Sequence, residues 1–281
     1  MRKSRAKCSW LTLLAAALLI GGMLAIILPV LQWDAEVSAE ASEYEQLREQ
    51  KRQADENVSE EMLNQHSVPL ISAMQENPSV AFPEKTAGEQ DAQLMADLSA
   101  YRTQNPDFVA WLRIPGTNVE YPVVQTDEPD YYLNHTFTGK TSVVGMLFSL
   151  ADADYETPGR NIAIYGHHLK CSGEKMFTSL IRYKNPNFYE DHRTIELDSL
   201  YRHSEYTIFA VVNMKAGDWQ PSRTVFSGNT AFMAFVNRAK EESLYNTGVE
   251  VDEDDHVLTL ITCDRSYAGQ AGRLVILAVE H

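Results

Sequence analysis

The stretches VLTLITC at 257–263 and RLVILAVE at 273–280 decide the fold of this chain of 281 residues. Both are dominated by β-branched and other apolar residues, which is typical of buried strands. A loop of nine residues with two glycines separates them, so antiparallel pairing would place Cys263 beside Arg273. Because side chains alternate between the two faces of a strand, Ile261 is predicted to share the face of Cys263.

Six further apolar runs precede this pair and are separated by turn residues, which predicts eight strands in all. Eight is the number expected of a small closed barrel or of a sandwich. One helix is predicted over 230–243, and a short helix from Leu94 must end before Pro106. The fold class is therefore mostly β with added helices, in one domain over 94–281. The other six strands are predicted near 109–114, 119–124, 145–150, 162–168, 193–200 and 205–214.

The formal net charge of −15 is unevenly spread along the chain. Residues 1–9 carry four basic residues and no acidic one, and residues 10–33 carry no charge. As a helix, this uncharged stretch would be about 36 Å long, enough to cross a hydrocarbon core of ~30 Å. The positive-inside rule then predicts a cytoplasmic tip over 1–9 and a single-pass transmembrane anchor over 10–33, with everything after Trp33 outside the cell.

A cleaved signal peptide is the alternative to this anchor. The apolar core of a signal peptide is only ~7–15 residues long, so the longer stretch here favours an uncleaved anchor. Both alternatives export the rest of the chain. The segment 34–93 is rich in acidic residues, and Pro69, Pro78 and Pro83 exclude a long helix near its end. We expect an acidic stalk or linker over 34–93, partly helical, that holds the domain off the membrane.

Composition excludes several other classes of function. With 24 Lys and Arg against 39 Asp and Glu, the chain is a poor candidate for binding nucleic acid, whose phosphates are contacted mainly by basic residues. The three cysteines, at positions 8, 171 and 263, are neither a disulfide framework nor a four-cysteine zinc site. The acidic run at 252–255 lacks the spacing of a known calcium loop, so a solvated turn is expected there.

The predicted pairing of Cys263 with Arg273 indicates nucleophilic chemistry. A guanidinium beside a thiol favours the thiolate and can hydrogen-bond a developing oxyanion. His167 and His168 end the predicted strand 162–168 and point to opposite faces, so only one of them is expected to join the cysteine. Imidazole can activate such a thiol and later protonate a leaving amine. The alternative role for Cys263 is that of a small core residue.

The same residues resemble a known family. TLITC at 259–263, with Arg273 downstream, resembles the signature of sortases, the membrane-anchored cysteine transpeptidases of Gram-positive surfaces. YGHH at 165–168 resembles their histidine segment. The segments that resemble class B sortases in particular are 105–125, 131–137 and 230–249.

This resemblance implies an eight-stranded sortase-type β-barrel and assigns roles to individual residues. Cys263 matches the nucleophile, and His167 matches the catalytic histidine, with His168 as the alternative. Arg273 matches the arginine that orients the substrate and stabilises the oxyanion. No metal or organic cofactor is implied.

Two further roles and three departures from the family pattern follow. The backbone N–H of Asp264 is expected to assist at the oxyanion, and Thr262 to shape the site. Ile261 stands where class B members often carry serine, and the segment 127–130 replaces their usual Asp-Asn. Cys171 lies in a loop where the family has no required thiol; an inert residue is the simpler expectation, and a bridge to Cys263 that switches the enzyme off is the alternative.

The implied reaction is cleavage of a C-terminal sorting signal after threonine, through a Cys263 thioester. An amine of a peptidoglycan precursor or cross-bridge then receives the exported surface protein. Class B relatives often prefer signals that contain Asn-Pro. One alternative is a pilin-polymerising sortase with a lysine acceptor, and another is a tethered binding module in which Cys263 is buried and unreactive. A papain-like wall hydrolase is disfavoured, because its cysteine precedes its histidine, whereas His167 precedes Cys263 here.

Overall fold

The computed structural model describes residues 25, 27–32, 35, 38–56, 98–128, 130–169 and 174–281. Within these ranges, no helix is both long and apolar enough to cross a membrane. The predicted cytoplasmic tip and most of the predicted anchor over 10–33 lie outside the described residues, as does Cys171.

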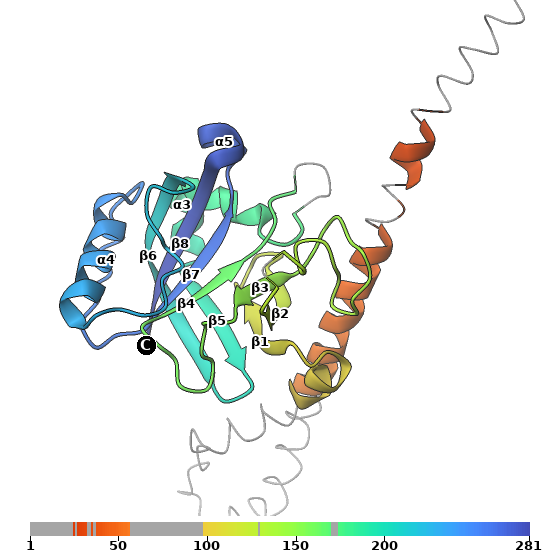
Figure 1. Cartoon of the computed structure of the whole chain (residues 1–281), viewed down its shortest axis with the longest axis horizontal. Helices are drawn as coiled ribbons and strands as arrows, with labels where there is room; N and C mark the ends of the chain where they lie inside the picture. Colours follow the sequence, from red (N-terminus) through yellow and green to blue (C-terminus); the bar gives the residue numbers. More distant parts are fainter. Residues whose placement is uncertain are drawn as a thin grey trace, which may run out of the picture.

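Eight strands form a closed barrel in the described part of the chain (Figure 1). Its strand order around the barrel is β1-β2-β3-β4-β7-β8-β6-β5. All eight strands predicted from the sequence are confirmed, and of the two architectures left open the barrel is the correct one. The strands are β1 (Phe108–Arg113), β2 (Glu120–Thr126), β3 (Leu147–Leu150), β4 (Asn161–Tyr165), β5 (Thr194–Ser199), β6 (His203–Lys215), β7 (Val257–Cys263) and β8 (Gly272–Glu280).

The pairing of β4 with β7 determines where the site forms. These two strands are parallel, with Tyr165 opposite Ile261, so their carboxyl ends meet at one end of the barrel. Strand β8 runs antiparallel to β7 on its other side, which brings its first residues to the same end. The end of β4 therefore meets the ends of β7 and β8, which are far from it in sequence, at one barrel mouth.

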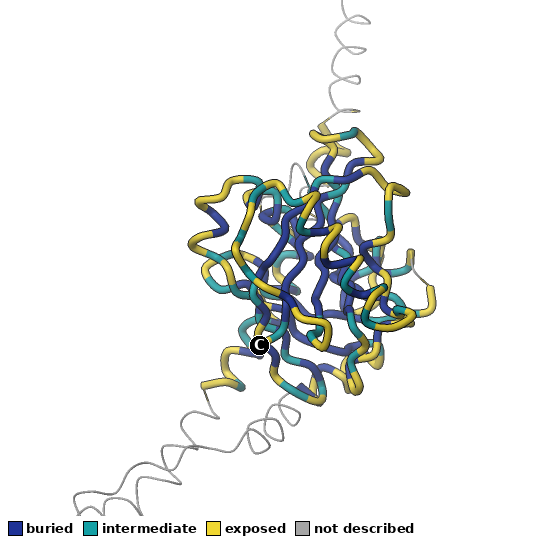
Figure 2. The backbone as a smooth tube through the Cα atoms, turned by 90° about the vertical axis from the view of Figure 1, so that its left-hand side faces the viewer, coloured by how far each residue is buried: buried dark blue, intermediate teal, exposed yellow. Residues whose placement is uncertain are grey.

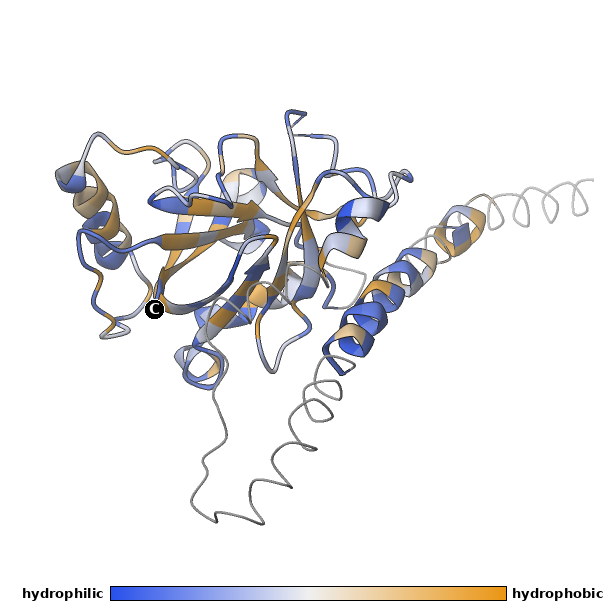
Figure 3. Ribbon diagram, turned by 90° about the horizontal axis from the view of Figure 1, so that it is seen from below, coloured by the Kyte–Doolittle hydropathy of each residue, from blue (hydrophilic) through white to orange (hydrophobic). Residues whose placement is uncertain are grey.

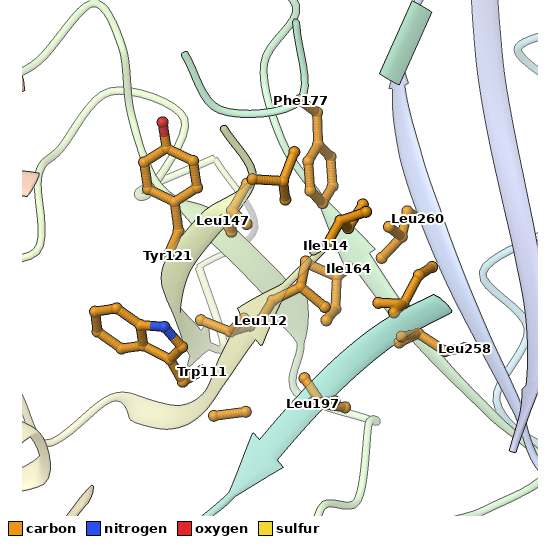
Figure 4. Packing of buried hydrophobic residues seen from close by; sticks show 14 of the residues in the cluster. Trp111, Leu112, Ile114, Tyr121, Leu147, Ile164, Phe177, Leu197, Leu258 and Leu260 are labelled. Carbon is orange, nitrogen blue, oxygen red and sulfur yellow. The ribbon is translucent and has the colours of Figure 1, made fainter. Parts of the chain in front are cut away.

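The barrel interior is filled by aliphatic and aromatic side chains (Figure 4). Leu258 and Leu260 of β7 are fully buried and pack with Ile164 of β4 and Leu112 of β1. Burying each such side chain contributes roughly 1.5–3 kcal/mol. Figure 2 shows buried residues through the middle of the domain and exposed residues mostly at its periphery. This rigid core fixes the barrel mouth.

A second buried cluster lies between the outer face of the barrel and helix α4 (Asn229–Glu241), which confirms the helix predicted over 230–243. Ile261, Val275 and Leu277 project from β7 and β8 toward this cluster, and Phe232 projects from the helix. Figure 3 shows the apolar strands beside the mixed surface of α4. The predicted alternation of faces along β7 is therefore confirmed: even positions face the barrel and odd ones face outward.

A helix over residues 38–56 packs against the barrel on the side away from α4 (Figure 1). Tyr44 and Leu47 are buried, and the Tyr44 hydroxyl donates to the Gly145 carbonyl at 2.7 Å. Arg48 donates to the carbonyl oxygen of Glu120 at 2.8 Å. This part of the stalk predicted over 34–93 is bound to the domain, and residues 57–93 lie outside the described residues. A short helix over 98–104 ends before Pro106, as predicted.

Short helical segments, which the sequence analysis did not predict, cover the barrel mouth. The 3₁₀ helix η1 (Thr178–Lys184) and helix α3 (Pro186–Asp191) connect β4 to β5. The helix α5 (Arg265–Ala268) and the 3₁₀ helix η2 (Gly269–Ala271) form the loop between β7 and β8.

Candidate active site

Cys263 and Arg273 face each other across two paired strands at the barrel mouth. Cys263 is the last residue of β7, and its register partner on β8 is Arg273, as the sequence predicted. The loop between them closes tightly, because the Asp264 N–H donates to the Gly272 carbonyl at 2.9 Å. A Cβ at position 272 would lie 2.0 Å from the Asp264 carbonyl oxygen, so only glycine fits this neck.

A cavity of about 400 Å³ opens beside Cys263. His167, Cys263 and Arg273 all contribute to its wall, so the fold brings together the three residues expected to be catalytic. Cys263 is partly exposed, unlike the buried thiol expected of a non-enzymatic module. The remaining lining is mostly apolar and comes from Asp130, Leu133, Phe148, Leu150, Tyr165, Gly166, Ile261 and Thr262.

The Arg273 guanidinium is held by the loop that precedes it. Its Nη1 donates to the carbonyl oxygens of Gln270 at 3.0 Å and Gly272 at 2.9 Å. A guanidinium has five N–H donors, so others remain to bind a substrate oxyanion. The charge of Arg273 also acts on Tyr165. Burial raises the pKa of the Tyr165 phenol, and the positive charge of Arg273 opposes this rise.

His167 is oriented by a hydrogen bond to the backbone. Its Nε2 lies 2.9 Å from the carbonyl oxygen of Leu133. A carbonyl only accepts, so Nε2 carries the proton and Nδ1 of the neutral ring is left to exchange one. This bond sets both the tautomer and the direction of the ring in the cavity.

Gly166 lets the histidine segment approach the core. A Cβ there would lie 2.5 Å from Leu147 Cδ2 and 2.7 Å from Phe177 Cδ2. Figure 4 shows the Leu147 and Phe177 side chains next to each other. The residue before His167 must therefore be glycine, because any side chain there would clash with the packed core.

His168 and Thr262 join the strand ends to each other. The two histidines point to opposite sides, as predicted: His168 does not line the cavity but places Nδ1 2.8 Å from the Cys263 carbonyl oxygen. The Thr262 hydroxyl is buried and donates to the Gly166 carbonyl at 2.8 Å. Both residues hold the site together, and Thr262 also lines the cavity.

The expectation for Asp264 requires a correction. Its backbone N–H was expected to face the oxyanion, but it is already bonded to Gly272 within the strand pairing. Its side chain is fully buried and accepts from the Ser266 N–H at 3.0 Å and the Ser266 hydroxyl at 2.6 Å. Burial alone would raise the pKa of Asp264, but Lys184 and Ser266 more than offset this effect, and the pKa is lowered.

Sequence reasoning missed Leu133, Tyr165 and Lys184. Tyr165 is two positions before His167, so strand alternation was a signal that both share one side. Phe148 stacks on Tyr165 with ring centroids 5.4 Å apart, which closes the apolar wall. Leu133 contributes its backbone carbonyl, and Lys184 lies at the end of the short helix η1. Neither contribution produces a periodic pattern of side chains in the sequence.

Comparisons with known proteins show the family and agree with the fold. A family model described as a sortase domain matches residues 112–281. Sortase B of Listeria monocytogenes is 33% identical over 172 residues, which covers 61% of this chain and 69% of the relative. Sortase B of Staphylococcus aureus is 30% identical over 174 residues, with 62% and 70% covered. The solved S. aureus sortase B–substrate complex superposes with a TM-score of 0.69 at 25% identity, covering 88% of this chain and 98% of that one.

Proposed function

The chain belongs to the sortase family of cysteine transpeptidases and is similar to its class B members, and from this premise we propose that Cys263, His167 and Arg273 carry out the reaction. The supporting observation is that these three residues line one cavity at the end of β4, β7 and β8. The substrate is the C-terminal sorting signal of an exported surface protein.

The first half of the reaction forms a thioester. Nδ1 of His167 takes the proton of the Cys263 thiol, the thiolate attacks the carbonyl carbon of the threonine in the sorting signal, and the C=O electron pair moves onto oxygen. Arg273 stabilises this oxyanion, since it lines the same cavity and its guanidinium retains donors beyond those bonded to the loop. As the oxyanion collapses, the C–N bond breaks, and Nδ1 of His167 gives the proton that it took from the thiol to the leaving amine.

The second half transfers the acyl group. An amino group of a peptidoglycan precursor or cross-bridge attacks the thioester carbonyl, while His167 takes up the proton that this amine loses. Collapse of the second tetrahedral intermediate releases the Cys263 thiolate. The product is the surface protein joined to the cell wall through a new amide bond.

The location follows from the charge pattern of the N-terminal region. Residues 10–33 anchor the chain in the cell membrane, with residues 1–9 in the cytoplasm and the domain over 94–281 outside. The helix over 38–56 belongs to the same outer part, since it is bonded to the barrel. Substrates and acceptor amine are then encountered on the outer face of the membrane.

Turnover of short peptides tests this function. Full-length protein in detergent should cleave quenched fluorescent peptides of the form Asn-Pro-X-Thr followed by one varied residue, and Cys263→Ala should not. Adding candidate wall amines should convert the hydrolysis product into an amide of matching mass. Equal cleavage by wild type and Cys263→Ala would refute the proposal.

A further inference from the structure

Three consecutive residues, the last two of β7 and the one that follows it, are each tied to the connection between β4 and β5. Thr262 is bonded to Gly166, and the Cys263 carbonyl to His168. The third tie is ionic: the Lys184 ammonium, at the end of η1, contacts Oδ2 of Asp264. The nucleophile thus lies between a hydrogen-bonded residue and an ion-paired one.

Asp264 differs from the other carboxylates near the site because it is fully buried. Its Oδ1 accepts from both donors of Ser266, and Lys184 pairs with Oδ2 and also donates to the Ser266 hydroxyl at 3.1 Å. A buried carboxylate is costly unless it is paired and hydrogen-bonded. The reaction proposed above uses neither Asp264 nor Lys184.

The backbone of Asp264 is equally constrained. Its N–H donates to Gly272 and its carbonyl accepts from Tyr267 at 3.2 Å, so every polar part of the residue is fixed. Gly272 in turn precedes Arg273, and its carbonyl oxygen accepts a hydrogen bond from the Arg273 guanidinium at 2.9 Å. A shift of Asp264 would therefore move both the thiolate and the guanidinium.

We propose that Lys184 and Asp264 are a positioning pair, which holds the Cys263 thiolate and the Arg273 guanidinium at the spacing needed for attack and oxyanion binding. This inference rests on the proposed function, because it concerns the same site. Lys184 acts through Asp264 and touches no reacting atom. A displacement of about 1 Å of a reacting group can cost on the order of 100-fold in rate, so losing the pair should lower kcat with little effect on KM.

The test compares Lys184→Met, Asp264→Asn and the double variant in the full-length protein. Activity on an Asn-Pro-X-Thr peptide is expressed per folded enzyme. Lys184→Met leaves a buried carboxylate without its cation, which could by itself cause misfolding. The double variant removes both charges and therefore avoids this cost. Lys184→Met should lower kcat roughly tenfold or more with KM within about twofold, and the double variant should be no more active. Lys184→Arg should restore most of the rate.

Lys240→Met is the matched control. Lys240 forms an exposed ion pair with Glu250 at 2.9 Å, away from the barrel mouth, and this variant should keep the wild-type kcat. The proposal is overturned if Lys184→Met and the double variant keep kcat within about twofold of wild type while only the melting temperature falls.

A second readout separates this proposal from the proposed function. The rate at which a methanethiosulfonate reagent modifies Cys263, measured on the peptide that contains it, needs no sorting signal. If wild type cleaves no peptide, the proposed function fails, and labelling still decides the positioning role. Loss of the pair should change the labelling rate several-fold, and an unchanged rate in both variants would overturn the inference.

Discussion

Cys263 and Arg273 are ten positions apart in the sequence and directly opposite each other on paired strands. Antiparallel register and a tight loop neck create this pair, and His167 reaches the same cavity from β4. The residues on which the chemistry depends are thus placed by backbone pairing. Side-chain hydrogen bonds, such as that from His167 to Leu133, then set their direction.

Replacing Arg273 tests its role at the oxyanion. Arg273→Ala should lower kcat/KM about 100- to 1000-fold, which is the usual effect of losing one preorganised oxyanion donor. Arg273→Lys should recover only part of this loss, because an ammonium keeps the charge but not the planar fork of donors. Steady-state kinetics on a cleaved peptide would measure both. Full activity of Arg273→Ala would contradict the assigned role.

Gly272 is predicted to tolerate no side chain. In Gly272→Ala, the new Cβ would meet the Asp264 carbonyl oxygen at 2.0 Å, and the backbone of the loop neck would have to move. We expect a loss of about 2 kcal/mol or more in the free energy of unfolding and a large loss of activity. Urea denaturation would measure the first. Gly159→Ala is the control, because its nearest neighbour would lie 3.3 Å away; equal effects of both variants would be inconsistent with the packing described.

At the scale of elements, the helix over 38–56 is part of the folded domain. Leu47 is buried beneath it, and Tyr101 donates to the Leu47 carbonyl at 3.1 Å. Leu47→Ala should therefore destabilise the protein by about 2 kcal/mol or more, whereas Gln50→Ala, on the exposed side, should change stability by less than ~0.5 kcal/mol. Thermal unfolding would measure both. A Leu47→Ala variant as stable as wild type would show that the helix is not docked in solution.

The contact between this helix and strand β5 should depend on pH. His203 donates to Asp198 at 2.6 Å, and Lys51 of the helix lies 3.5 Å from the same carboxylate. The hydrogen bond to Asp198 raises the pKa of His203 above its usual value of 6.5, despite its partial burial. Burial alone would raise the pKa of Asp198, but His203 and Lys51 outweigh it and the pKa is lowered.

The sign follows from these two directions. A raised histidine pKa contributes stability below pH 6.5, which is lost as pH rises through the folded value; a lowered aspartate pKa contributes stability that is lost as pH falls through its folded value. His203→Gln should therefore cost most near pH 5–6 and little near pH 9, by at most about 1 kcal/mol because the pair is half-exposed. Denaturant titrations at the two pH values would measure it. Lys240→Met should show no such dependence, and a cost of His203→Gln that grows with pH would contradict the assignment.

The sequence predicted the strands better than the covering segments, for physical reasons. Strands β7 and β8 alternate with a period of two because one face meets the barrel interior and the other meets α4. The helix over 38–56 buries only two large apolar side chains and completes its contact with Arg48 and Lys51, so its apolar stripe was too thin to indicate docking. Segment η1 has no periodic signal, and therefore Lys184 could not be connected to Asp264 in advance.

At the scale of the whole molecule, one closed barrel supports a site built from three strand ends. The core fixes these ends, α4 covers the outer face of β7 and β8, and the helix over 38–56 closes the opposite side (Figure 1). The site therefore needs no large rearrangement to bring its three residues into one cavity. This arrangement is consistent with the class B sortases to which the chain is similar.

The central claim is that Cys263 carries the acyl intermediate, and intact-protein mass spectrometry tests it directly. Full-length protein mixed with an Asn-Pro-X-Thr peptide and quenched in acid should gain the mass of the peptide up to its threonine. Fragmentation should place this mass on Cys263, and hydroxylamine should remove it. An adduct on another residue, or the same adduct on Cys263→Ala, would contradict the account.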